Sequence, residues 1–316
     1  MPQLIIDTAN LEEIIAARQT GLLAGVTTNP TLVARQVKLL KAQGQQISLA
    51  ALYDKIIESA GKQACTSFEV IATDYTGMIL EGRKIHKKFP NAWVKVPVCT
   101  SVDNQNELFE GLQAIHDLSN EGIKINCTLI NMASQGVLAA IAGAYVLSPF
   151  TGRVNDLLRE TLQQKFMKED YYPATGQIIN GEEVIDKYGC AVSGVDMARQ
   201  LVQLLRNINS SAKVLAASVR NKHEAHECAS IAGVDYITMP AKVFMSAAPD
   251  MPQSRLVAKA GGKYHYPMNW EELCSLREKN EILISDWIYH PKTVEGMKGF
   301  LNDAKCIEKE YRELFV

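Results

Sequence analysis

The sequence places a lysine, Lys95, inside the almost entirely apolar stretch WVKVPVCT, which covers residues 93–100. Apolar runs rich in β-branched residues are typical of buried strands. An ammonium group buried in such a strand must find a partner or lose its proton. A lysine that gives up its proton readily can attack a carbonyl group and form a Schiff base. The competing interpretation is a buried ion pair between Lys95 and either Glu69 or Asp7.

Further polar residues lie near the C-terminal ends of other predicted strands, where barrel enzymes place their chemistry. Glu69 lies within an apolar run, and buried carboxylates without a partner are rare. The remaining members of the set are Asp7, Thr27, Thr28, Asn29, Asn126, Thr128, Ser148, Arg153, Ser218 and Arg220.

Most of these residues, taken alone, have an ordinary structural interpretation. Asp7, Ser218 and Asn221 are each suited to capping a following helix. Asn29 is suited to a turn, and Arg153 is suited to a surface ion pair. Because polar residues recur at several strand ends, the set as a whole favours a reactive lysine.

Short β-rich runs alternate with amphipathic helical stretches along most of the chain. The predicted strands are Leu4–Thr8, Gly25–Thr28, Ser67–Ala72, Trp93–Val98, Lys124–Leu129, Tyr145–Pro149, Lys213–Val219 and Tyr236–Met239. Most are apolar on both faces, as strands covered by helices must be. This pattern predicts an α/β fold, a single (β/α)8 TIM barrel. The alternative, an open doubly wound sheet, usually has a glycine-rich turn after its first strand, where this chain reads DTANLEE.

Two regions depart from the alternation. Between Arg153 and Lys213 we expect a helix, then an inserted loop or hairpin at Met167–Val195, then the helix Gly194–Arg206. The insertion follows the sixth strand and contains the turn signals YYPATG and Asn180-Gly181.

The second region is a C-terminal helical extension, residues 261–316, joined to the barrel of residues 1–260 within one domain. The segment Ala258–Lys263 is interpreted as a linker. Two helical patterns follow Asn269, and the last has Val294, Met297, Leu301 and Ala304 on one face. We expect this extension to pack on the barrel or over its mouth.

Composition excludes several classes of protein. The chain has 316 residues, a formal net charge of −2, 47% hydrophobic residues and 22% charged residues, as ordinary globular proteins do. This charge gives no reason to expect a nucleic acid or a membrane surface as partner. The first residues, MPQLIIDTAN, do not resemble a signal peptide, so a cytoplasmic location is expected.

The cysteines and histidines give no reason to expect a metal. The seven cysteines form no CxxC pair, which favours reduced thiols. His223, Glu224, His226 and Cys228 are close in sequence, but the spacing HExH differs from the zinc-binding HExxH. We interpret these residues as a solvated helix face.

Six motifs follow one another in a familiar order: DTAN from Asp7, GVTTNPTL from Gly25, VKVP from Val94, INCTL from Ile125, SPFTGR from Ser148 and LAASVRN from Leu215. In this order and over roughly Leu4–Pro240, the sequence resembles the transaldolase family, which includes the fructose-6-phosphate-aldolase-like members. The resemblance implies a class I aldolase barrel that uses neither a metal nor an organic cofactor.

The resemblance implies a role for each matching residue. Lys95 corresponds to the Schiff-base lysine and Asp7 to the acid/base at the sugar hydroxyl. Glu69 and Thr128 correspond to the pair that holds a catalytic water. Thr27 and Thr28 correspond to a motif that lines the barrel floor, and Thr28 is implied as a binding residue. Asn29 and Asn126 correspond to residues that bind the dihydroxyacetone moiety, and Ser148 and Phe150 to further binding positions. Arg153, Ser218 and Arg220 correspond to the phosphate site.

The implied reaction transfers a dihydroxyacetone unit from a ketose phosphate, fructose 6-phosphate or sedoheptulose 7-phosphate, to an aldose in the pentose phosphate pathway. Its partners are small sugar phosphates, and a homo-oligomer is compatible with the sequence. Aldolase-like members carry Gln where this chain has Glu69 and Tyr where it has Phe150, so both positions favour transfer. The alternatives are a fructose-6-phosphate-type aldolase, a transaldolase for another anionic ketose, and a non-catalytic phosphosugar-binding barrel.

Overall fold

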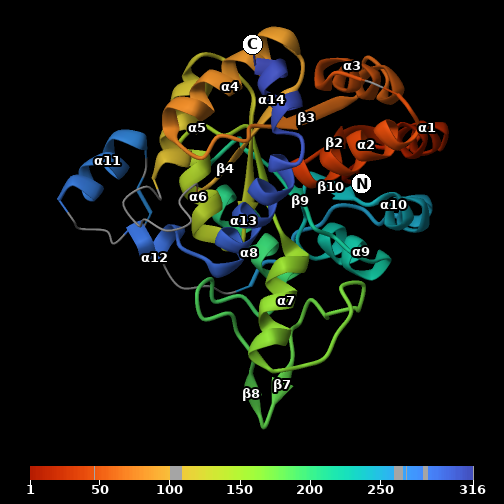
Figure 1. Ribbon diagram of the computed structural model, residues 1–316. Coiled ribbons are helices and arrows are strands. Elements are labelled where there is room, and N and C mark those ends of the chain that lie inside the picture. Colours follow the sequence, from red (N-terminus) through yellow and green to blue (C-terminus); the bar gives the residue numbers. More distant parts are fainter. Residues whose placement is uncertain (46, 100–108, 260–265, 268, 280–283, 316) are drawn as a thin grey trace.

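The computed structural model of the chain describes residues 1–45, 47–99, 109–259, 266–267, 269–279 and 284–315. Within these residues a closed barrel of parallel strands has the order β1-β10-β9-β6-β5-β4-β3-β2 (Figure 1). Its strands are β1 (Gln3–Asp7), β2 (Leu23–Thr27), β3 (Cys65–Glu69), β4 (Trp93–Pro97), β5 (Ile125–Ile130), β6 (Val146–Pro149), β9 (Lys213–Ala216) and β10 (Tyr236–Met239). The predicted (β/α)8 barrel is confirmed.

Helices follow the barrel strands and cover the outside of the barrel (Figure 1). They are α1 (Leu11–Gln19), α2 (Pro30–Ala42), α3 (Leu49–Ala60), α4 (Tyr75–Lys88), α5 (Glu110–Asn120), α6 (Ala133–Ile141), α7 (Thr151–Thr161), α8 (Gly194–Asn207), α9 (Lys222–Ser230) and α10 (Ala241–Ala247), which continues into the 3-10 turn η2 (Ala248–Asp250). No helix among the described residues is long and apolar enough to cross a membrane.

Two predicted strands extend three residues too far at their C-terminal ends. β3 ends at Glu69 instead of Ala72, because the amides of Ile71 and Ala72 donate to the Glu81 carboxylate and the chain turns toward α4. β9 ends at Ala216 instead of Val219, because Ser218 takes a left-handed backbone conformation with φ of 59°.

Side chains alternate along each barrel strand between the barrel interior and the layer of helices. On β4, Val94 and Val96 join the large apolar core beneath the helices, as predicted. Trp93 instead lies in the interior, where it packs with Ile5, Val146 and Leu215. These four interior side chains form an apolar base at the N-terminal end of the barrel.

A polar layer lies immediately above this apolar base. Two residues beyond Ile5, Trp93 and Val146 are Asp7, Lys95 and Ser148, and all three line one cavity. Because strand side chains repeat every second residue, the three strands that contribute Ile5, Trp93 and Val146 to the base also contribute to the polar layer. The strand period therefore places chemically active side chains at the C-terminal end of the barrel.

The insertion after the sixth strand was predicted to be a loop or a hairpin, and it contains a short hairpin. β7 (Ile178–Ile179) pairs antiparallel with β8 (Glu182–Glu183). The turn residues Asn180 and Gly181 have φ of 52° and 83°, as a two-residue type I′ turn requires. The hairpin projects from the barrel beyond α7 (Figure 1).

The C-terminal extension contains α11 (Trp270–Glu278), α12 (Ile284–Ile288), α13 (Pro291–Lys305) and α14 (Glu308–Phe315), where only two helical patterns were predicted. Shortness explains the error, since α12 spans 5 residues and α14 spans 8. Met297 and Phe300 of α13 are buried against Leu129, Phe150 and Ala217 near the C-terminal ends of the barrel strands. Of the two predicted positions, α13 therefore takes the one over the mouth.

Buried polar contacts fix α13 in this place. His290, the N-cap of α13, lies 3.3 Å from the Asp186 carboxylate, and both side chains are fully buried. Thr293 Oγ1 donates to the carbonyl of Leu129 at 2.9 Å. The predicted boundary at 260/261 and most of the predicted linker lie outside the described residues.

Close backbone contact between α7 and α8 gives a test of the packing. A Cβ atom on Gly194 would lie 1.9 Å from the carbonyl oxygen of Thr151, a backbone atom that moves only if α7 moves. We expect Gly194→Ala to lower the free energy of unfolding by about 1–3 kcal/mol. Urea unfolding followed by circular dichroism measures the effect.

The matched control is Gly299→Ala in α13, where an added Cβ would have no atom of the described residues within 4 Å outside the backbone of its own helix. Alanine is a better helix former than glycine, so this substitution should raise the free energy of unfolding by up to about 1 kcal/mol. Similar effects of the two substitutions would contradict the close contact at Gly194.

Candidate active site

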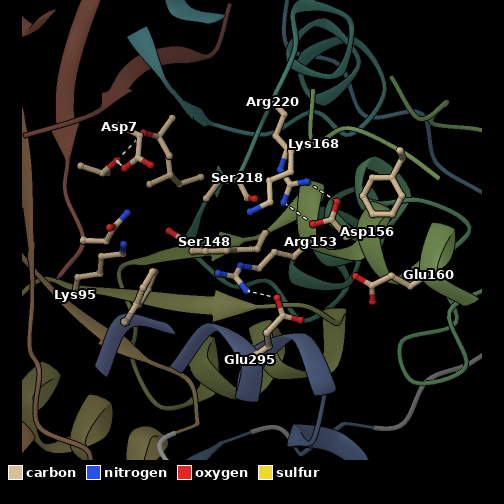
Figure 2. Close-up of a pocket in the computed structure, with 18 residues that line it drawn as sticks. Asp7, Lys95, Ser148, Arg153, Asp156, Glu160, Lys168, Ser218, Arg220 and Glu295 are labelled. Atoms are coloured by element: carbon tan, nitrogen blue, oxygen red, sulfur yellow. Dashed lines mark hydrogen bonds and ion pairs between the residues drawn. The ribbon is translucent and has the colours of Figure 1, made fainter. Parts of the chain in front are cut away.

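A cavity of about 330 Å³ opens at the C-terminal end of the barrel (Figure 2). Asp7 and Lys95 lie at one end, and Arg153, Arg220 and Lys168 lie toward the other. The structure thus brings together, around one cavity, most of the residues that the sequence singled out. Those that line it are Asp7, Thr27, Asn29, Lys95, Ser148, Phe150, Arg153, Ser218 and Arg220.

Lys95 is buried, with 4% of its surface exposed, and it points into the cavity. Its Nζ lies 2.9 Å from Oε2 of Glu69 and donates to the carbonyl of Thr28 at 3.1 Å. The ion pair of the competing interpretation is therefore present, with Glu69 as the partner. The lysine also lines the cavity, so a ligand in the cavity can reach its amino group.

Two buried carboxyl groups lie within the electrostatic influence of this lysine. Burial raises the pKa of Glu69, and the attraction of Lys95 only partly opposes the increase. Burial likewise raises the pKa of Asp7, opposed by Lys95 and by a hydrogen bond from Thr27 Oγ1 of 2.8 Å. Both groups can therefore hold or release a proton closer to neutral pH than ordinary carboxyl groups do.

A second group of polar side chains crosses the barrel beside the lysine. Ser148 Oγ donates to Asn126 Oδ1 at 2.6 Å, and Asn126 Nδ2 donates to Ser67 Oγ at 3.0 Å. Thr128 is fully buried, and its Oγ1 has no hydrogen-bond partner within the described residues. A buried hydroxyl group of this kind usually bonds to an ordered water or a ligand.

Three residues of the GVTTNPTL motif have separate positions. Thr27 lines the cavity and bonds to Thr238 Oγ1 as well as to Asp7. Thr28 bonds to the carbonyl of Ser67 and does not line the cavity, so it acts on Lys95 through its backbone. Asn29 caps α2 through Oδ1 and also borders the cavity.

The far end of the cavity holds a firmly positioned guanidinium group. Arg220 donates through both Nη atoms to the Asp156 carboxylate, with an Nη2–Oδ2 distance of 2.7 Å. Its backbone amide donates to the buried Glu224 at 2.9 Å. Arg153 lies nearby, with Nη1 3.6 Å from Oε1 of Glu295 on α13. Such fixed forked donors suit a phosphate group.

Several residues of this cavity were not predicted. Asp156 lies three residues after Arg153 on α7, so the helix period could have suggested it. Phe300 lies three residues after Met297 in α13, beside the predicted apolar face but not among its predicted residues. Glu160 lies on the same face of α7, and Thr238 is a polar residue near the end of the last predicted strand, so local periods could have suggested both. Phe166, Lys168 and Glu295 carry no such signal, since long-range packing brings them here.

The predicted solvated face at the start of α9 is wrong for two residues. Glu224 and Cys228 are buried, because α9 turns this side toward α8 and the barrel. Among the described residues, no group of three or more His, Cys, Asp or Glu side chains could hold a metal ion.

Two of the three suggested helix caps are wrong. Asn10, not Asp7, caps α1, and Ser218 lines the cavity from a left-handed turn. Asn221 does cap α9. Asp7 and Ser218 thus do not cap helices, and both line the cavity where a ligand could contact them.

The raised pKa of Asp7 predicts a pH-dependent effect on stability. A carboxyl group whose pKa is raised by folding ionises first in the unfolded chain, so its ionisation destabilises the fold as pH rises above about 4. Asp7→Asn removes this destabilisation. We expect its melting temperature, relative to wild type, to be higher at neutral pH than at about pH 4. The control Asp54→Asn lies at an exposed position on α3, and its melting temperature relative to wild type should be the same at both pH values. A pH dependence equal to that of Asp7→Asn would contradict the burial argument.

Comparison with known proteins identifies the family of this chain. The chain matches the Transaldolase/Fructose-6-phosphate aldolase family over residues 4–311. It is 38% identical over 242 residues to a probable transaldolase of Roseiflexus sp. (strain RS-1), covering 76% of this chain and 87% of that protein. It is 36% identical over 245 residues to a probable transaldolase of Thermus thermophilus, covering 77% and 88%. The predicted resemblance is confirmed, and the chain belongs to the transaldolase/fructose-6-phosphate aldolase family.

Proposed function

We propose that this protein is a transaldolase that moves a dihydroxyacetone unit from a ketose phosphate to an aldose acceptor. The observation that carries the proposal is a single cavity with a buried lysine at one end and two arginines at the other. A ketose phosphate has a carbonyl group near one end and a dianion at the other. The proposed donor, fructose 6-phosphate or a related ketose phosphate, would place its carbonyl at Lys95 and its phosphate at Arg153 and Arg220.

The reaction would begin at Lys95. The neutral amine attacks the ketose carbonyl carbon, the carbonyl oxygen takes up a proton, and loss of water from the carbinolamine leaves a protonated Schiff base. Glu69, 2.9 Å from Nζ, is placed to exchange protons during these steps. Its raised pKa suits a group that must both give and take a proton near neutral pH.

Cleavage requires a base at the sugar hydroxyl group. We assign this role to Asp7, which lines the cavity together with Lys95. Asp7 takes the hydroxyl proton, the adjacent carbon–carbon bond breaks, and its electrons are held by the Schiff base as an enamine. The aldose phosphate product then leaves. Reversal of these steps with an aldehyde acceptor completes the transfer.

We assign Thr128 and Glu69 to a water that relays protons to the carbinolamine. The buried Oγ1 of Thr128 has no hydrogen-bond partner among the described residues, which supports a water at this point. Asn126 and Ser148, already fixed by their mutual hydrogen bond of 2.6 Å, would hold the hydroxyl groups of the three-carbon unit.

Apolar side chains beside the lysine favour transfer over release. Phe150 packs with Leu129, Ala217, Met297 and Phe300. The Phe300 ring centroid lies 5.9 Å from Lys95 Nζ. These groups offer no hydroxyl to hold a water that would protonate the enamine, so the enamine would persist until an acceptor arrives.

A direct test of the nucleophile is borohydride trapping with fructose 6-phosphate. Wild type should gain a reduced adduct on the peptide that contains Lys95. Lys95→Met should gain none and lose activity by roughly four orders of magnitude or more. The control Lys124→Met, exposed at the opposite end of the barrel, should behave as wild type. An adduct on another lysine in wild type would refute the assignment.

A second test separates transaldolase from aldolase. Release of glyceraldehyde 3-phosphate from fructose 6-phosphate should require erythrose 4-phosphate in wild type. Phe150→Tyr should raise release without the acceptor by about tenfold or more, because a phenol can position water at the enamine. Equal release with and without acceptor in wild type would make the protein an aldolase.

A further inference from the structure

Lys168 enters the cavity from a compact turn in the segment after α7. The Met167 amide donates to Asp170 Oδ2 at 2.8 Å, and the Asp170 amide donates back to the Met167 carbonyl at 3.0 Å. These reciprocal bonds close a turn over residues 167–170 with Lys168 inside it. The backbone of Lys168 is therefore held in one conformation.

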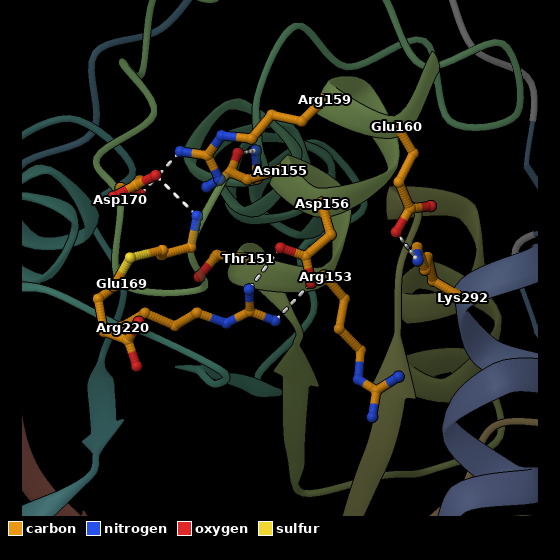
Figure 3. Close-up of polar contacts among 12 residues, drawn as sticks. Thr151, Arg153, Asn155, Asp156, Arg159, Glu160, Glu169, Asp170, Arg220 and Lys292 are labelled. Atoms are coloured by element: carbon orange, nitrogen blue, oxygen red, sulfur yellow. Dashed lines mark hydrogen bonds and ion pairs between the residues drawn. The ribbon is translucent and has the colours of Figure 1, made fainter. Parts of the chain in front are cut away.

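The turn is attached to the barrel on two sides. The buried Arg159 of α7 donates through Nη2 to the carbonyl of Asp170 at 2.7 Å (Figure 3). Asn221 Nδ2 donates to the carbonyl of Glu169 at 3.3 Å. Asn221 adjoins Arg220 in the chain, so this second bond ties the turn to the phosphate-binding end. Lys168 accordingly lies beside Arg220 in the cavity (Figure 2).

Charge at this end of the cavity is largely balanced without Lys168. Arg220 is held by Asp156, Arg153 faces Glu295 at 3.6 Å, and Glu160 is paired with Lys292 at 2.7 Å. Among the described residues Lys168 forms no ion pair within 4 Å, and its charge interacts with that of Glu295 only at longer range. A dianion that enters therefore meets two arginines that are each paired with a carboxylate, and one lysine that forms no close ion pair among the described residues.

We propose that Lys168 is a specificity-determining residue that selects substrates with a phosphate monoester at this end. The arginines supply forked donors, and Lys168 supplies a further positive charge that no close ion pair occupies. The proposal deepens the transaldolase function proposed above and rests on it for the substrate class. The segment after α7 would thereby contribute a residue that recognises the phosphate of the substrate.

The test compares Lys168→Gln with Lys165→Gln. Lys165 is exposed in the same segment and does not line the cavity. Each variant is assayed for transfer from fructose 6-phosphate and from unphosphorylated fructose. We expect Lys168→Gln to reduce the kcat/KM ratio of phosphorylated to unphosphorylated donor by about tenfold, since one charge-assisted contact is lost. Lys165→Gln should leave that ratio unchanged.

A structural role alone predicts a different pattern, in which both donors lose equally. Equal losses, or no loss in Lys168→Gln, would overturn the proposal. The preference of wild type for the phosphorylated donor should also weaken with added sodium chloride more than that of Lys168→Gln, because an exposed lysine is readily screened.

Binding of inorganic phosphate, measured by calorimetry, separates this inference from the proposed function. Weaker binding of inorganic phosphate by Lys168→Gln than by Lys165→Gln supports the role of Lys168 even if no variant transfers dihydroxyacetone, in which case only the proposed function fails. Equal binding by both variants contradicts the role of Lys168 whether or not the enzyme is a transaldolase.

Discussion

A buried ammonium group is the constraint on which the rest of this structure depends. Lys95 is almost completely shielded from water, and a charge in such a place is very costly unless it is compensated. Glu69 and the carbonyl of Thr28 supply that compensation from the two preceding strands. Since a buried ion pair adds little net stability, its presence in the barrel interior is better explained by chemistry than by folding.

The same principle applies at the other end of the cavity, with arginine in place of lysine. Asp156 holds Arg220 through two hydrogen bonds, and the buried Glu224 holds its backbone. A guanidinium group fixed in this way loses little entropy when an anion binds. The cost is a reduced net charge, which increases the importance of nearby cations such as Lys168.

Much of the fold follows from local rules, and the motif residues follow with it. Along β4, the alternation of Trp93, Val94, Lys95 and Val96 predicts which side chains point inward. Errors arose where local signals compete. Asp7 is as suitable a cap as Asn10, and only the course of the chain makes Asn10 the cap of α1. Glu224 and Cys228 were predicted to be exposed to solvent, because a short polar helix has no clear apolar stripe to indicate its buried side.

The sequence by itself determined the barrel, the inward face of β4 and the grouping of Lys95 with Glu69 or Asp7. These depend on a two-residue period and on motifs a few residues long. Only the tertiary structure decided that Glu295 and Phe300 of α13, and Lys168 after α7, complete the cavity. Their contacts join segments far apart in the chain, and no local period encodes where such segments meet.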